Sequence, residues 1–278
     1  MNNPIVIIGA GMAGARACIN LRANGYEGEI VLIGEEALLP YDRPPLSKAS
    51  IMQDGDPAPI WLMDETIARE LKVTARTGVQ ATAINRAEKR VTLSDGTNQA
   101  YSKLLLATGA KPRKLTLPGG EHALTLRNHE DTLELRSRFQ RGKTVVIIGG
   151  GFIGLELASS AAKKGCHVTL VEAQPRILMR GVPEAISKII HEEHVKHGVT
   201  MLVGTGLSHL TPDAVHLADG RVLPADCIIA GIGAAPDVKL AQDAGLAIEN
   251  GIACDDHMQT TLFPYTTLFR IGRASCRE

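Results

Sequence analysis

Two glycine segments of this 278-residue chain have the spacing of a phosphate-binding turn. The first contains Gly9, Gly11 and Gly14, and the second contains Gly149, Gly151 and Gly154. In such a segment the first glycine permits a tight turn from strand to helix. The second lets the backbone approach a pyrophosphate, and the third lets helix and strand pack closely. The repeated pattern therefore predicts two sites for dinucleotide cofactors.

An acidic residue follows each glycine segment where a ribose hydroxyl needs an acceptor. Glu35 lies 21 residues after the last glycine of its segment, and Glu172 lies 18 residues after the last glycine of the other. An isolated glycine pattern is weak evidence in a chain with 28 glycines, but the acid in each copy supplies the expected context. A carboxylate at Glu172 favours NADH, because it repels a 2′-phosphate. Arg176 and Arg180 nearby are expected to keep that preference moderate.

These residues need strands and helices to position them, and the apolar pattern supplies both. Strands are expected at 5–8, 30–33, 145–148 and 168–171, with a helix after each glycine segment. Asp-Gly steps at 95–96 and 219–220 predict hairpin turns before the apolar strands 104–106 and 228–230. The fold class is therefore α/β, with two Rossmann-like units. The first is expected at 1–115 and the second at 116–240, inserted into the first, which resumes at 241–260.

Composition indicates a globular protein and argues against nucleic-acid and membrane partners. Hydrophobic residues make up 44% of the chain, the formal net charge is zero, and no apolar run reaches 18 residues. The first strand begins too close to Met1 for a secretory signal, so a cytoplasmic protein is expected. The five cysteines form no Cys-x-x-Cys pair, and the histidines of 191–197 lack the spacing of a zinc protease. No metal site is expected, and 191–197 is interpreted as a solvated helix face.

Two nucleotide sites on two such units suggest a tightly held flavin dinucleotide and a nicotinamide cofactor that visits it. Between the two glycine segments lies a stiff stretch, residues 41–48, with prolines at 44 and 45. It carries Arg43 and Lys48 to defined places. Alternatively, Arg43 and Lys48 are charged loop residues in contact with solvent. For Glu156, two residues after the last glycine of the second segment, the alternative is an exposed helix residue.

The chain resembles the NADH-dependent ferredoxin reductases of Rieske-type aromatic-ring dioxygenase systems, which are relatives of putidaredoxin and rubredoxin reductases. The resemblance rests on the two glycine segments, the stretch 41–48, the strand ends 107–109 and 231–233, and the stretch 172–176. It implies a glutathione-reductase-like fold with FAD in the first unit and NADH in the second. It also implies electron transfer to an iron–sulfur ferredoxin, of Rieske or [2Fe–2S] type. No cysteine lies in 41–48, so electrons are expected to leave directly from the reduced flavin.

The resemblance also implies roles for individual residues. Flavin contacts are implied at Ala13, Glu35, Arg43, Lys48, Ala81 and Arg127. Contacts to the nicotinamide cofactor are implied at Glu172 and Arg180. Further nucleotide contacts are implied at Ala107, Gly109, Ile153 and Gly233. Lys48, beside the flavin ring, is expected to pair with Glu156 at the nicotinamide site, and these two residues form the implied catalytic pair.

Two alternative functions remain open. One is a reductase of the same fold with another acceptor, such as rubredoxin, a nitrite reductase partner or oxygen. The other is an NAD-binding fragment with no flavin and no turnover, because residues 261–278 depart from the family pattern. That stretch resembles a translation of a common sequencing adapter followed by one of its reverse complement, and it is interpreted as an assembly artefact. The first unit is then expected to lack its final parallel strand.

Overall fold

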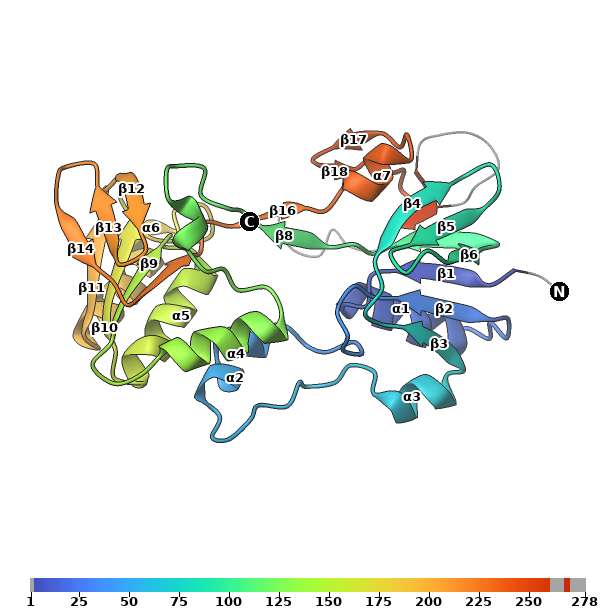
Figure 1. Ribbon diagram of the computed structural model, residues 1–278, viewed down its shortest axis with the longest axis horizontal. Coiled ribbons are helices and arrows are strands. Elements are labelled where there is room, and N and C mark those ends of the chain that lie inside the picture. The colour runs from blue at the N-terminus through green and yellow to red at the C-terminus, as the bar shows by residue number, and fades with distance from the viewer. Residues whose placement is uncertain (1–2, 261–267, 271–278) are drawn as a thin grey trace. The chain divides into compact units, whose positions relative to one another are not determined.

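The chain folds into two compact units in a computed structural model that describes residues 3–260 and 268–270 (Figure 1). The first unit comprises 3–42, 60–110 and the described residues from 236 onward, and the second comprises 43–59 and 111–235. Residues 43–59 were expected in the first unit, within 1–115, but they pack with the second. Up to residue 260 the chain passes between the units four times, and the strands at the last two passages, β8 (Ala110–Pro112) and β16 (Ala234–Pro236), pair with each other.

A five-stranded parallel sheet forms the centre of the first unit, in the order β19-β7-β1-β2-β3. The strands are β1 (Ile5–Ile8), β2 (Ile30–Ile33), β3 (Val73–Arg76), β7 (Lys103–Leu106) and β19 (Leu268–Arg270). Leu268 of β19 lies in register with Leu104 of β7. The expectation that this unit lacks its final parallel strand is therefore wrong. The rest of the stretch interpreted as an artefact, 261–267 and 271–278, lies outside the described residues.

Successive residues of these strands enter two different cores. Ile7 and Leu32 pack with helices α1 (Met12–Ala23) and α3 (Glu65–Glu70). Val6 and Ile33 face the other way, toward an antiparallel sheet and α7. The elements on that side are β4 (Ala81–Asn85), β5 (Arg90–Leu93), β6 (Asn98–Ala100), α7 (Lys239–Asp243), β17 (Ile248–Glu249) and β18 (Gly251–Ile252). Because both faces are covered, β1 and β2 are continuous apolar runs.

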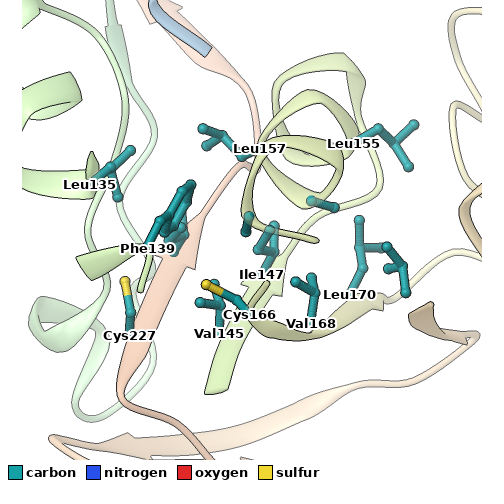
Figure 2. Close-up of a cluster of buried hydrophobic side chains, with 14 of the residues drawn as sticks. Leu135, Phe139, Val145, Ile147, Leu155, Leu157, Cys166, Val168, Leu170 and Cys227 are labelled. Carbon is teal, nitrogen blue, oxygen red and sulfur yellow. The ribbon is translucent and has the colours of Figure 1, made fainter. Parts of the chain in front are cut away.

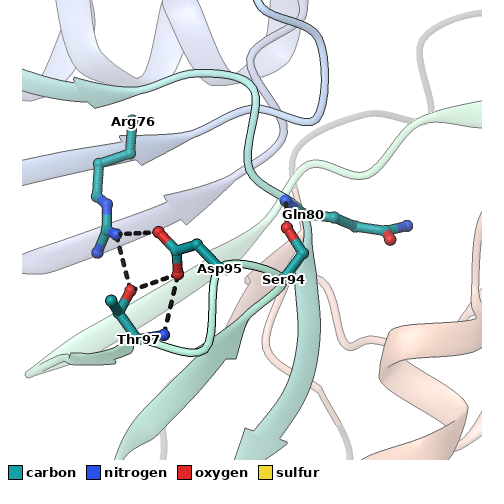
Figure 3. A network of polar contacts seen from close by, with 5 residues as sticks. All are labelled: Arg76, Gln80, Ser94, Asp95 and Thr97. Atoms are coloured by element: carbon teal, nitrogen blue, oxygen red, sulfur yellow. Dashed lines mark hydrogen bonds and ion pairs between the residues drawn. The ribbon is translucent and has the colours of Figure 1, made fainter.

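The predicted turn at Asp95 joins β5 to β6 and is attached to the central sheet (Figure 3). The backbone N–H of Thr97 donates to Asp95 Oδ1 at 2.9 Å, and Arg76 Nη2 donates to Asp95 Oδ2 at 2.9 Å. The hydrogen bonds from Thr97, with the charge of Arg76, hold the pKa of Asp95 below its usual value. Since Arg76 ends β3, these contacts link the turn of the antiparallel sheet to the parallel one.

The second unit repeats this plan with a four-stranded parallel sheet in the order β11-β10-β9-β15. Its strands are β9 (Thr144–Ile148), β10 (His167–Glu172), β11 (Val199–Val203), β15 (Cys227–Ala230) and the antiparallel β12 (Leu207–Thr211), β13 (Ala214–Leu217) and β14 (Val222–Pro224). Its helices are α4 (His129–Arg138), α5 (Phe152–Lys163), α6 (Glu184–Lys196) and the 3-10 helix η2 (Gly120–His122). Ile147 packs toward Leu157 and Phe139 (Figure 2), whereas Val146 packs toward Val215 of β13.

The arm, which we define as residues 43–59, is an integral part of the second unit. It contains the 3-10 helix η1 (Pro44–Ser47) and helix α2 (Ala49–Met52), and Ile51 is fully buried in the second unit's core. Arg136 of α4 donates hydrogen bonds to the carbonyl oxygens of Ser50 at 3.0 Å, Gln53 at 2.5 Å and Gly55 at 2.6 Å. These contacts fix the path of the arm and hence the position of Lys48.

Candidate functional site

The first and third glycines of each segment are required by the protein itself. Gly9 and Gly149 have φ angles of +116° and +109°, a region that favours glycine. A Cβ would lie 2.1 Å from a carbonyl oxygen at Gly9 and 2.5 Å from one at Gly149. At the third positions, Gly14 and Gly154, a Cβ would lie 2.0 Å from the carbonyl oxygen of the segment's first glycine. These four glycines therefore permit the turn and the packing of helix on strand.

The middle glycine of each segment has no such internal reason. Gly11 and Gly151 have φ angles of −94° and −82°, which any residue adopts. Among the residues that the structure describes, a Cβ on Gly11 would meet no atom within 4 Å, and one on Gly151 would meet only the carbonyl oxygen of Gly231, at 3.8 Å. The space in front of both residues fits a ligand that approaches the backbone closely, as a pyrophosphate does. The residues present thus fit a dinucleotide at each loop.

The two helices that follow these loops begin without side-chain caps. α1 and α5 start after Gly11 and Gly151, and neither has a carboxylate in its first turn. Two other helices are capped: Asp64 accepts from the N–H of Ile67 at the start of α3, and Asn128 begins a capping box on α4. Helices α2, α6 and α7 also begin without a side-chain cap. The free N–H groups and the positive dipole ends of α1 and α5 are suited to bind phosphate.

The acid of the second loop is held in place by backbone N–H groups. Glu172 Oε2 accepts a hydrogen bond from Gly150 at 2.6 Å, and Oε1 accepts one from Gln174 at 2.7 Å. Glu172 ends β10, so it lies at the edge of the glycine loop where the ribose acceptor is expected. In the first unit, Glu35 follows β2 at the corresponding place, with its side chain exposed.

The two arginines near Glu172 are not equivalent. Arg176 donates from Nη1 to the carbonyl oxygen of Val182 at 3.1 Å and from Nη2 to that of Met179 at 3.1 Å. It therefore shapes its own loop, whereas Arg180 is exposed. The expected moderating effect of these two arginines on the NADH preference stays a prediction.

Lys48 and Glu156 form an ion pair within the second unit. Lys48 Nζ lies 2.8 Å from Glu156 Oε1, and the two side chains are 51% and 30% exposed. Glu156 lies on α5, two residues after the last glycine of the loop, and Lys48 follows η1. The pair borders a cavity of about 480 Å³ whose other walls include Met52, Phe152 and His194. The arm and the nucleotide loop thus bring a cation and a carboxylate to the same cavity.

Ser47 also belongs to this site and was not among the predicted site residues. Its side-chain hydroxyl donates to Glu156 Oε2 at 2.5 Å, and the residue is only 1% exposed. The hydroxyl of Ser160, one turn further along α5, donates to the backbone oxygen of Ser47 at 2.7 Å. The only sequence signal for a role of Ser47 in the site was its position next to Lys48. That position did not show that the Ser47 side chain faces α5.

The remaining predicted cofactor contacts are divided between the two units. Ala13, Glu35, Ala81, Ala107 and Gly109 belong to the first unit. Arg43, Lys48 and Arg127 belong to the second, where Arg43 Nη1 donates to the backbone oxygen of Arg127 at 2.5 Å. The predicted nicotinamide-side contacts Ile153, Arg180 and Gly233 are also in the second unit.

The histidine-rich stretch of α6 includes one structural residue. His194 Nδ1 lies 2.8 Å from the carbonyl oxygen of Ile190, and Nε2 lies 3.1 Å from that of Leu155. His194 therefore ties α6 to α5, so the interpretation of the whole stretch as a solvated face is wrong at this position. Among the described residues, no cluster of three histidine, cysteine or acidic side chains is arranged to hold a metal ion.

Three cysteine thiols are buried and unreactive in character. Burial raises the pKa of Cys18 and of Cys227 to about 12 and raises that of Cys166 as well. A thiolate nucleophile at neutral pH is therefore not available from these three residues.

Within the part of the chain that the structure describes, no helix has the length and apolar character needed to cross a bilayer.

Comparison with known proteins identifies the family. The family model described as pyridine nucleotide-disulphide oxidoreductase matches residues 3–272. The chain belongs to this family. Rubredoxin-NAD(+) reductase of Pseudomonas putida is 38% identical, with 96% of this chain and 71% of the relative covered. The ferredoxin--NAD(+) reductase component of an anthranilate 1,2-dioxygenase system from Burkholderia cepacia is 38% identical, with coverage of 93% and 65%.

A solved structure of this family has the same fold. The covalent putidaredoxin reductase–putidaredoxin complex matches with a TM-score of 0.91 and 36% identity, covering 98% of this chain and 67% of the other. The chain thus spans 65–71% of the length of these three family members. The predicted α/β fold with two Rossmann-like units and the predicted family are confirmed. The chain spans 64% of the length of the putidaredoxin reductase of Pseudomonas putida and 62% of that of the rhodocoxin reductase of Rhodococcus erythropolis, each 38% identical.

Proposed function

We propose that the protein is an FAD-dependent reductase that passes electrons from NADH to a [2Fe–2S] ferredoxin of a ring-hydroxylating dioxygenase system. One observation carries the proposal: each unit has its own loop whose middle glycine is needed by no contact with the described part of the chain. Two bound dinucleotides would account for the two open loops. The dioxygenase-system reductase from Burkholderia cepacia, at 38% identity, supports a ferredoxin as acceptor.

In this proposal the first unit binds FAD and the second binds NADH. The loop of Gly9–Gly14 and the carboxylate of Glu35 bind the flavin's adenosine diphosphate part, with Ala13, Ala81, Ala107 and Gly109 as further contacts in that unit. When bound, the flavin accepts a hydride from NADH and passes on single electrons. Arg43 and Arg127 bind polar groups of the flavin. Ile153, Glu172, Arg180 and Gly233 bind NADH beside the loop of Gly149–Gly154.

Lys48 and Glu156 orient the nicotinamide. The carboxylate of Glu156 accepts a hydrogen bond from the carboxamide N–H of the nicotinamide, and Lys48 balances the carboxylate's charge.

The buried thiols support direct electron transfer to an iron–sulfur protein. Reduction of a disulfide through the protein needs a cysteine thiolate beside the flavin, and the arm contains no cysteine.

Acceptor exchange tests this proposal. NADH oxidation by the flavin-loaded protein is measured with a Rieske-type ferredoxin, a [2Fe–2S] ferredoxin, rubredoxin and oxygen alone. We expect the highest kcat/KM with a ferredoxin, at least about tenfold above oxygen, since specific docking sets the rate. A protein that binds NADH but neither takes up FAD nor turns over would show an NAD-binding fragment instead.

Rubredoxin is the second candidate acceptor. The 38% identity to the rubredoxin-NAD(+) reductase of Pseudomonas putida equals the identity to the dioxygenase-system reductase. A higher kcat/KM with rubredoxin than with either ferredoxin would favour it and would overturn the ferredoxin assignment.

A further inference from the structure

Ser47 and Lys48, which are consecutive residues of the arm, each contact one oxygen of the Glu156 carboxylate. Lys48 contacts Oε1 at 2.8 Å, while the Ser47 hydroxyl donates to Oε2 at 2.5 Å. A hydroxyl donating to a carboxylate oxygen at this distance makes a strong, charge-assisted hydrogen bond. The two oxygens of one carboxylate are thus bound by two consecutive residues of the arm.

The two partners differ in how firmly they hold the carboxylate. Ser47 is 1% exposed, and a serine side chain has a single carbon between backbone and hydroxyl. The Lys48 side chain is 51% exposed and ends a flexible four-carbon stem. An exposed ion pair contributes little, because ordering a long side chain offsets its attraction. Ser47 is therefore the partner that determines the orientation of Glu156, and Lys48 is free to exchange.

Ser47 is itself fixed to two helices of the second unit. Its backbone oxygen accepts from the Ser160 hydroxyl at 2.7 Å, and Ser160 lies one turn after Glu156 on α5. The preceding backbone oxygen, of Leu46, accepts from Thr132 on α4 at 3.3 Å. Both serines are buried. The hydroxyl of Ser47 therefore points at Glu156 from a rigid support before any nucleotide binds.

We propose that Ser47 is a positioning residue that orients the Glu156 carboxylate to accept the carboxamide N–H of a nicotinamide. This inference rests on the proposed NADH site of the second unit. Because Ser47 already donates to Oε2, the carboxamide N–H of the nicotinamide donates to Oε1. There it either binds beside Lys48 or displaces the Lys48 ammonium group. Positioning an acceptor in advance reduces the ordering cost of binding.

A double-mutant cycle on the NADH affinity of this chain tests the role. Ser47→Ala is expected to raise the Kd for NADH about tenfold, the effect of losing one hydrogen bond to a charged group. In a Glu156→Ala background the same change should alter the Kd less than about twofold, because the carboxylate is gone. Ser160→Ala is the matched control. It removes the neighbouring bond between arm and helix, leaves both contacts of Glu156 intact, and should change the Kd less than about twofold.

A second readout needs neither nucleotide nor flavin. In protein carrying ¹³C-labelled glutamate, the carboxyl NMR signal of Glu156, assigned by its loss in Glu156→Ala, should shift in Ser47→Ala and stay in place in Ser160→Ala. If Ser47→Ala does not fold, Ser47→Cys serves instead, since a thiol of similar size is a much weaker donor.

The outcomes separate the two proposals. If the unmodified chain does not bind NADH, the proposed function fails and the nicotinamide part of the Ser47 proposal fails with it, while the NMR signal still decides whether Ser47 orients the Glu156 carboxylate. If NADH binds but Ser47→Ala has the same Kd and the same Glu156 signal as the unmodified chain, the positioning role is overturned. Equal effects of Ser47→Ala and Ser160→Ala would also overturn it, because the serines would then act only by anchoring the arm.

Discussion

Glu172 and Gly150 are joined by a hydrogen bond of 2.6 Å from the backbone N–H of Gly150 to Glu172 Oε2. This bond connects the end of β10 to the glycine loop, and the N–H of Gln174 donates to the other carboxylate oxygen at 2.7 Å. The acid expected to bind a ribose therefore also holds the loop in shape. Any substitution of Glu172 acts on both the ligand and the loop.

Replacement of Glu172 by alanine should weaken NADH binding and reduce discrimination against NADPH. Loss of the charged acceptor is expected to cost about 1–3 kcal/mol of NADH binding. Glu172→Gln is the informative companion, because it keeps one oxygen for a loop N–H but removes the charge that repels a 2′-phosphate. The Kd values for both nucleotides, measured by titration calorimetry, check this. An unchanged ratio of the two in both variants would contradict the assignment.

The middle and last glycines of the second loop should respond differently to alanine. A Cβ at Gly151 meets nothing closer than 3.8 Å, so Gly151→Ala should change the free energy of unfolding by less than about 1 kcal/mol. It should still raise the Kd for NADH more than about tenfold, because the methyl group occupies the pyrophosphate's place. At Gly154 a Cβ would lie 2.0 Å from a carbonyl oxygen, so Gly154→Ala should destabilise the unit. Circular dichroism and NADH titration distinguish the two effects.

Removal of the Lys48–Glu156 pair should slow hydride transfer. The ion pair is partly exposed, so Lys48→Met is expected to change the free energy of unfolding by less than about 1 kcal/mol. Glu156→Ala also leaves the buried Ser47 hydroxyl without its carboxylate acceptor, so it is expected to cost about 1–3 kcal/mol of stability. In flavin-loaded protein, stopped-flow reduction by NADH should slow by about tenfold or more in Glu156→Ala while flavin content stays constant. Unchanged reduction rates would rule out a role for the pair.

Tyr101 offers a test of packing in the first unit. Its ring is fully buried, and its hydroxyl has no hydrogen-bond partner within the described residues. Tyr101→Phe should therefore leave the free energy of unfolding unchanged or raise it by up to about 1 kcal/mol. Tyr41→Phe is the matched control, because the Tyr41 hydroxyl donates to Glu36 Oε2 at 2.5 Å. That variant should be destabilised. Urea unfolding of both checks the prediction.

The buried thiols predict a loss of stability in alkaline solution. The folded-state pKa values of Cys18 and Cys227 are raised from 9.0 to about 12, so the stability they contribute is fully present below pH 9 and is lost as the pH rises toward 12. The expected slope is roughly 1.4 kcal/mol per thiol per pH unit in this range. Urea unfolding from pH 8 to 10.5 measures it, and alanine at both positions should flatten the slope. An equal slope with and without these thiols would show that other groups govern it.

Much of the fold and the cofactor loops followed from local sequence pattern. The glycine spacing, the continuous apolar strands and the acids at 35 and 172 express requirements of a few neighbouring residues, such as a positive φ at Gly9 or a strand covered on both faces. The same reasoning predicted the hairpin at Asp95, where the turn residues bond to one another. Such features are readable because the backbone conformation and burial that they need are encoded within one segment.

The partners of individual side chains were decided only by the tertiary structure. Packing placed the arm with the second unit and brought Ser47 to Glu156, 109 positions away in sequence. It also turned Arg176 inward to its own loop, set His194 against α5 and seated Leu268–Arg270 beside β7. A polar side chain bonds to whichever acceptor lies within reach once the helices and sheets have packed. No local pattern specifies that neighbour, so these contacts could not be predicted from the chain's sequence alone.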